Sequence, residues 1–96
     1  MKILIVEDDV KLSALLARGL REEGHVVESE QDGLAGEAAV RSGEYDVLLV
    51  DVMLPNKDGL SMVRDLRASG TTTPIVVMTA RDAAADGGSR ESWSMR

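Results

Sequence analysis

Runs of consecutive apolar residues recur along the chain at the length of β-strands. They cover residues 3–6, 47–50 and 75–78, and a less apolar segment lies at 25–28. Runs without alternating polar residues are typical of strands buried on both faces, as in the middle of a parallel sheet. We therefore predict four strands, the third starting at Tyr45. The strand at 25–28 should lie near an edge, because it includes His25 and Glu28.

Between the strands, apolar residues at helical spacing predict three helices. Gly24, Gly43 and Gly70 mark their ends, and Asp32 can cap the second helix. The positions expected to face the core are, helix by helix, Leu12, Leu15, Leu16 and Leu20; Leu34, Ala35, Ala38 and Ala39; and Leu60, Val63 and Leu66. Strands that alternate with helices over short connections predict an α/β fold with a doubly wound parallel sheet.

The last part of the chain has a different character. From Asp82 onward it has no clear period, and Gly87 and Gly88 would stop a helix begun by the preceding alanines. We therefore assign residues 1–86 to one small domain and residues 87–96 to an irregular tail.

Composition excludes several classes of function. The net charge is −6 with no basic run, so this chain alone should not bind nucleic acid. It has no cysteine, which excludes disulfides and thiolate metal sites. The apolar start, residues 1–6, is too short for a signal peptide or a membrane span. We expect a soluble cytoplasmic domain with no membrane contact.

Carboxylates follow two of the predicted strands where each strand ends. Glu7 and Asp8 follow the first strand, and Asp51 follows the third. Neighbouring parallel strands end at the same edge of a sheet, where ligands bind in open α/β folds, so these acids should converge there. Clustered carboxylates repel one another unless a cation or a proton intervenes, and an all-oxygen ligand set suits Mg²⁺. Thr79 and Ala80 follow the fourth strand and reach the same edge, where a hydroxyl could donate to a phosphoryl oxygen.

The sequence gives less support to other kinds of functional site. His25 is a lone histidine, and we expect a surface position. No dinucleotide fingerprint or P-loop is present, and the serines lack a histidine partner.

Several segments together carry a resemblance to a known family, and they span residues 1 to about 86. The chain resembles the receiver domain of two-component response regulators, in the branch with a winged-helix DNA-binding domain. The segments that carry the resemblance are Lys2-Ile3-Leu4-Ile5-Val6-Glu7-Asp8-Asp9, Asp32-Gly33, Tyr45-Asp46-Val47, Asp51-Val52-Met53-Leu54-Pro55, Asp58-Gly59, and Pro74-Ile75-Val76-Val77-Met78-Thr79-Ala80-Arg81.

This resemblance implies a flavodoxin-like fold and transfer of a phosphoryl group from a sensor histidine kinase to Asp51. It implies that Asp8 and Asp51 bind Mg²⁺ directly, Glu7 through water and Met53 through its backbone carbonyl. It makes Thr79 the switch hydroxyl and, with Ala80, a contact of the phosphoryl group, whereas Asp9 is a bystander. Such a domain receives a phosphoryl group without being a turnover enzyme.

The chain departs from the family pattern after residue 86. We expect it to lack the fourth helix, the fifth strand, the fifth helix and the lysine that would contact the phosphoryl group. Without this lysine, phosphotransfer should be impaired. A frameshift or an early stop in a regulator gene would produce such an ending. This hypothesis fails if neither shifted reading frame of the coding DNA encodes the missing segments. The predicted result is an unpaired apolar edge at residues 75–78, which should drive dimerisation. Trp93 and Met95 are candidates to cover the exposed apolar surface.

Three other functions are alternatives to phosphotransfer. The main alternative is a receiver remnant that cannot be phosphorylated and acts only as a dimerising or interaction fragment. An FMN site of the flavodoxin type is rejected, because acids stand where a phosphate loop is needed. A metal-dependent phosphatase is disfavoured, because Met53 occupies the place of a second catalytic acid.

Overall fold

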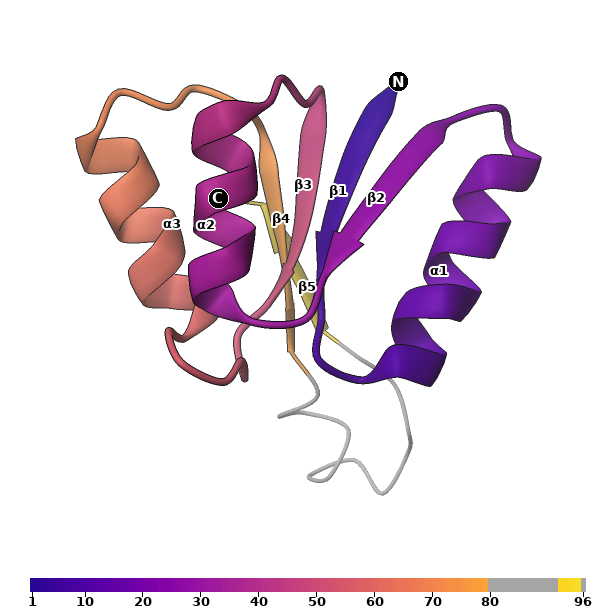
Figure 1. The fold of residues 1–96 in the computed structure, drawn as a ribbon, viewed down its shortest axis with the longest axis horizontal. Helices are drawn as coiled ribbons and strands as arrows, with labels where there is room; N and C mark the ends of the chain where they lie inside the picture. Colours follow the sequence, from indigo (N-terminus) through magenta and orange to yellow (C-terminus); the bar gives the residue numbers. More distant parts are fainter. Residues whose placement is uncertain (80–91, 96) are drawn as a thin grey trace.

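The described residues fold into one five-stranded sheet with three helices (Figure 1). The computed structural model describes residues 1–79 and 92–95, and for Thr79 and residues 92–95 it describes the backbone alone. The strands are β1 (Lys2–Val6), β2 (Val26–Glu30), β3 (Val47–Asp51), β4 (Ile75–Thr79) and β5 (Ser92–Met95). The helices are α1 (Val10–Glu22), α2 (Gly33–Ser42) and α3 (Gly59–Ala68).

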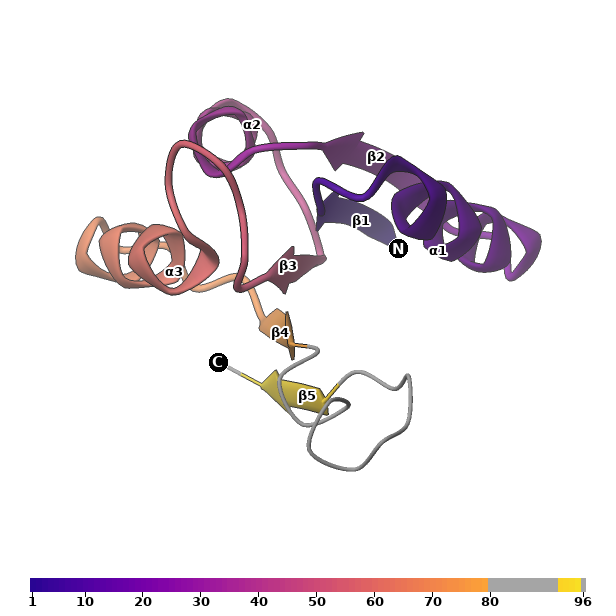
Figure 2. The same cartoon turned by 90° about the horizontal axis from the view of Figure 1, so that it is seen from below.

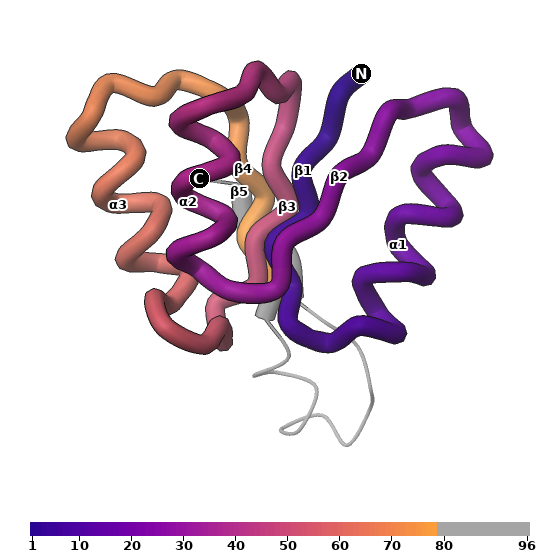
Figure 3. The backbone as a smooth tube through the Cα atoms, viewed as in Figure 1, coloured from indigo at the N-terminus to yellow at the C-terminus, as the bar shows by residue number. Residues whose placement is uncertain are grey.

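The first four strands form the parallel sheet that the sequence predicts. The strand order is β2-β1-β3-β4-β5, and β1 pairs in parallel with both β2 and β3. The less apolar strand β2 lies at an edge, as expected. Because Val6 lies opposite Val50, the strands β1 and β3 end side by side. This register brings the residues after both strands to one edge of the sheet, which the tube in Figure 3 shows at the lower end of the view.

The helices divide between the two faces of the sheet. Figure 2 shows α2 and α3 on one face and α1 on the other. Under α2 and α3, strand residues such as Leu4, Leu48 and Ile75 pack with Met62 and Leu66 into the larger core cluster. This face therefore holds most of the buried apolar surface that stabilises the described part of the chain.

The face of the sheet that carries α1 is less completely covered. Alternate residues of β3 are only half-buried there, including Val47 and Leu49. The prediction that β3 is buried on both faces is therefore wrong for this face. The reason is that α1 is the single helix on it among residues 1–79, and it packs chiefly over β1 and β2.

The buried stripe of α1 differs from the predicted one. Leu15 is 67% exposed, whereas Ser13 and Ala17 are buried. The stripe runs through Ser13, Leu16, Ala17 and Leu20, which share one helix face at the i, i+3, i+4, i+7 spacing. Leu15 does not share this face of the helix and is therefore exposed.

Helix α2 is also turned relative to its prediction. It buries Gly33, Gly36 and Val40, while Leu34 is 56% exposed. A β-carbon at Gly36 would lie 2.8 Å from a methyl carbon of Val6, so only glycine permits this close approach. A close contact of this helix face is therefore made by Gly36, which has no side chain.

Residues 92–95 form a strand, which corrects two expectations. The strand β5 pairs antiparallel with β4, with Val77 opposite Ser94 and Thr79 opposite Ser92. The tail is therefore not irregular over these four residues, and residues 76–79 do not form an unpaired edge. The dimer contact predicted through residues 75–78 is not available while β5 occupies this edge.

Candidate functional site: an acidic cluster at the end of the sheet

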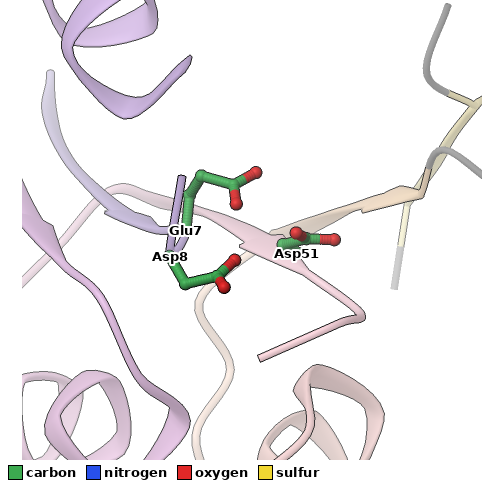
Figure 4. Close-up of side chains that lie close together, drawn as sticks. All are labelled: Glu7, Asp8 and Asp51. Atoms are coloured by element: carbon green, nitrogen blue, oxygen red, sulfur yellow. The ribbon is translucent and has the colours of Figure 1, made fainter. Parts of the chain in front are cut away.

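Three carboxylates meet where β1 and β3 end. Glu7 and Asp8 follow β1, Asp51 ends β3, and one oxygen from each lies within 4.8 Å of the others. Figure 4 shows the side chains of Glu7 and Asp8 extending toward the side on which Asp51 lies. The convergence expected from the strand ends is present, and its cause is the parallel pairing of β1 with β3.

The turn from β1 into α1 fixes the first two acids. The backbone N–H of Glu7 donates to the carbonyl of Glu30 at 3.0 Å, which extends the strand pairing by one residue. Asp9 caps α1, because its side chain accepts from the N–H of Leu12 at 3.1 Å. The N–H of Asp9 also donates to Glu7 Oε2 at 3.1 Å. Asp9 therefore orients a site residue, a role that the sequence does not reveal.

Glu7 is a buried acid with one unpartnered oxygen. Its side chain is 2% exposed, and its Oε1 has no hydrogen-bond partner among the described residues. Burial raises the pKa of Glu7 to about 8, and contacts with Asp51 and Asp8 act in the same direction against the N–H of Asp9. Without a cation, Glu7 is therefore mostly protonated near neutral pH.

The segment after β3, residues 52–58, forms the other wall of the site. The N–H of Met53 donates to Asp51 Oδ1 at 3.2 Å, so this residue lies directly against the central carboxylate. The segment returns to α3 through a bond from the N–H of Gly59 to the carbonyl of Val52 at 3.0 Å. Asn56 has a φ of 68°, a conformation that asparagine tolerates better than most residues.

A shallow pocket of about 500 Å³ opens beside the cluster. Most of its wall is apolar and comes from the segment after β3, while Asp8 and Asp58 contribute carboxylates. The lining residues are Asp8, Val52, Met53, Leu54, Pro55 and Asp58. A small group bound at the acids would therefore have apolar contacts on one side.

The donor set fits a hard divalent cation. All three clustered side chains offer oxygen, and the Glu7 oxygen without a partner is an acceptor that a bound cation or its water could satisfy. The lysines and arginines in ion pairs, such as Lys57 and Arg41, contact acids elsewhere. The three carboxylates of Glu7, Asp8 and Asp51 therefore fit a divalent cation such as Mg²⁺.

Two predicted site residues are placed only in part. Thr79 is the last residue of β4, so its backbone lies at the carboxyl end of a strand that pairs with β3. The side chain of Thr79 is not described. Ala80 lies outside the described residues. The roles predicted for them remain predictions.

The roles of Lys57 and Asp58 were not predicted from the sequence. Asp58 caps α3 by accepting from the N–H of Ser61 at 2.9 Å, and a capping residue before a helix is a signal that could have been found. Lys57 lies between acids of two helices, Glu37 and Asp65. No spacing rule pairs Lys57 with Glu37, because the two are distant in sequence.

Comparison with known proteins identifies relatives over most of the chain. The family described as "Response regulator receiver domain" matches residues 3–89. The chain is 48% identical to the transcriptional regulatory protein TcrA of Mycobacterium tuberculosis over 86 residues, which are 90% of this chain and 34% of that protein. It is 45% identical to the response regulator protein PmrA of Pseudomonas aeruginosa, covering 90% of this chain and 39% of PmrA. The chain thus spans little more than a third of the length of these relatives.

Solved structures agree with the fold. The receiver domain of Klebsiella pneumoniae RstA, activated with BeF3, superposes with a TM-score of 0.79 at 33% identity, covering 93% of this chain and 81% of that one. The Thermotoga maritima response regulator TrrA, in complex with Mg(2+)-BeF, superposes with a TM-score of 0.79 at 28% identity. The match covers 88% of this chain and 75% of TrrA. With its flavodoxin-like sheet, its acidic cluster and these relatives, the chain belongs to the receiver domain family of two-component response regulators.

Proposed function

We propose that this chain is a phosphoacceptor domain that takes a phosphoryl group onto Asp51. The donor is the phosphohistidine of a sensor histidine kinase, and Mg²⁺ is the cofactor. One observation carries the proposal, namely the meeting of Glu7, Asp8 and Asp51 at the ends of adjacent parallel strands with a buried, unpartnered carboxylate oxygen among them. Family membership supports the same reading.

The residues of the site have different roles in the transfer of the phosphoryl group. An ionised oxygen of Asp51 attacks phosphorus while the bond from phosphorus to the donor nitrogen breaks, and the nitrogen keeps the electron pair. Asp51 is held for this attack by the N–H of Met53 and by its place at the end of β3. Mg²⁺, when bound, supplies positive charge that offsets the charge of the phosphoryl oxygens.

The metal ligands are those that the resemblance to the receiver domain family implies. Asp8 and Asp51 would bind the cation directly, Glu7 through water, and Met53 through its carbonyl. This assignment agrees with burial, because Glu7 is the most enclosed of the three acids and Asp8 the most exposed. In this proposal, the hydroxyl of Thr79 donates to the phosphoryl group, and Ala80 contacts it.

The wider role follows from the relatives. Response regulators such as TcrA are named as transcriptional regulators, so we place this chain in a signalling protein of that type in the cytoplasm. None of the helices in residues 1–79 combines the length and hydropathy needed to cross a membrane. The chain is a phosphoryl acceptor rather than a turnover enzyme.

Mass spectrometry after incubation with Mg²⁺ and a small phosphodonor tests the proposal. The wild-type chain should gain one phosphoryl group, and Asp51→Asn should gain none. Glu44→Gln removes an exposed acid outside the cluster and should behave as wild type. An adduct that persists in Asp51→Asn would refute the assignment of Asp51. No adduct on the wild type would favour the phosphorylation-incompetent interaction fragment.

A further inference from the structure

The segment that joins β3 to α3, residues 52–58, carries part of the site and is held by several contacts. We call it the β3–α3 loop. At its start, Met53 donates to Asp51, and Val52 donates from its N–H to the carbonyl of Met78 at 3.1 Å. At its end, Asp58 caps α3. Between these two ends the loop lies against α2 and α3, so its position depends on its contacts with these helices.

Lys57 supplies that attachment through its side chain. Its Nζ lies 2.5 Å from Glu37 Oε1 on α2 and 2.5 Å from Asp65 Oδ2 on α3. The side chains of Lys57 and Glu37 are only 20% and 16% exposed, so this pair is shielded from water more than the other ion pairs of the described residues. One ammonium group thus ties the loop to both helices on this face of the sheet.

The second carboxylate oxygen of Glu37, which Lys57 does not contact, is paired with Arg41. Arg41 Nη2 lies 2.9 Å from Glu37 Oε2, and Arg41 Nη1 donates to Ser69 Oγ at 3.0 Å. The pKa of Glu37 is lowered, mainly by Lys57 and then by Arg41, so Glu37 stays ionised around neutral pH. Lys57 is therefore anchored to a network that spans α2 and α3.

The backbone of the loop is pressed against α2 at the same place. The N–H of Gly33 donates to the carbonyl of Pro55 at 3.2 Å. A β-carbon at Gly33 would lie 1.7 Å from the carbonyl oxygen of Lys57, so the two backbones are in direct contact. Movement of Lys57 would therefore move the same short loop that holds Met53 beside Asp51.

We propose that Lys57 is a positioning residue for the cation site, which it serves by locking the β3–α3 loop to Glu37 and Asp65. This inference rests on the proposed function, because it assigns to Met53 of that loop a metal-binding carbonyl. Lys57 touches neither the cation nor the phosphoryl group. It fixes the distance between the Met53 backbone and the carboxylates of Asp8 and Asp51, and groups that orient metal ligands commonly change metal affinity when removed.

Calorimetric titration of the full chain with Mg²⁺ tests this inference. Lys57→Met keeps the aliphatic stem and removes the charge, and it should raise the Kd for Mg²⁺ roughly tenfold. Lys57→Arg, which retains a cation in reach of both acids, should restore most of the affinity. Arg18→Met is the matched control, because Arg18 pairs with Glu22 on exposed α1 and should leave the Kd unchanged.

The titration must separate positioning from simple stabilisation. It is run well below the midpoint of thermal unfolding of each variant, which circular dichroism establishes. A lower midpoint for Lys57→Met with an unchanged Kd would overturn the inference, since the network would then be structural only. Glu37→Gln gives a second test, and it should weaken Mg²⁺ binding in the same direction.

Asp51→Asn distinguishes failure of the inference from failure of the proposed function. If Asp51→Asn abolishes Mg²⁺ binding and Lys57→Met does not weaken it, only the role of Lys57 is refuted. If Asp51→Asn binds as the wild type does, or if the wild type does not bind Mg²⁺, the cation site and the inference both fail.

Discussion

At the scale of single residues, Glu7 shows how burial and charge act against stability at this site. Its carboxyl group is buried beside two other acids, and its pKa is raised to about 8 from the ordinary value of 4.5, chiefly by burial. The unfolded chain releases this proton near the ordinary value, and the folded chain holds it until the pH is much higher. The stabilising effect of the proton is therefore complete below about pH 4.5 and is lost as the pH rises through about 8.

Glu7→Gln should remove this pH dependence in the metal-free protein. With EDTA present at pH 9, we expect the variant to be more stable than the wild type by about 1–3 kcal/mol, because no buried charge forms without a partner. At pH 5 the two proteins should differ little. Urea unfolding at both pH values measures the difference, with Glu44→Gln as the control for loss of an exposed acid. Equal stability at pH 9 would contradict the prediction.

At the scale of elements, the pairing of β5 with β4 decides whether the sheet has an open apolar edge. Residues 76–79 lie opposite residues 92–95 in antiparallel register. A parallel strand buried in a sheet is rich in branched apolar residues and, when left unpaired, invites pairing with another chain. The strand β5 is short and has two serines, so as an edge strand it should pair with another chain less readily than β4 would.

Deleting residues 92–96 should expose the edge of β4 and cause self-association. Sedimentation velocity over a range of concentrations is the measurement, with the 96-residue chain as the matched control. We expect the weight-average mass of the shortened chain to rise with concentration more steeply than that of the control. Identical concentration dependence would show that β5 does not protect this edge.

At the scale of the whole molecule, a cation at the acidic cluster would couple binding to folding. The cluster joins residues that follow β1 and β3, and the β3–α3 loop connects it to α2 and α3. The unfolded chain does not hold these groups together, so the cation should bind the folded state alone. Binding then stabilises the fold by an amount set by the ratio of free cation to Kd.

Mg²⁺ should therefore raise the free energy of unfolding, by about 2.7 kcal/mol at a free concentration 100 times Kd. Thermal unfolding followed by circular dichroism, with NaCl at matched ionic strength as the control, measures the shift. Removing Mg²⁺ with EDTA should reverse it, and Asp51→Asn should abolish it. A midpoint that responds equally to NaCl and to MgCl2 would indicate screening rather than a specific site.

Local patterns in the sequence were sufficient to predict the parallel strands of the core. The runs at β1, β3 and β4 have no polar alternation, which predicted strands, and the intervening helical periods predicted crossovers on both faces. The same logic placed Glu7, Asp8 and Asp51 together, because parallel strands end at a common edge. The helix faces were harder to predict, since small residues such as Ser13 and Gly36 made the close contacts and left Leu15 outside.

Sequence by itself thus determined the parallel strands of the core, the family and the three acids of the site, because each depends on short-range pattern or on recognisable motifs. Only the tertiary structure decided the pairing of β5 with β4, the burial of Glu7 and the bridge from Lys57 to Glu37 and Asp65. These features join residues far apart in the chain, and no local period encodes which distant partners meet.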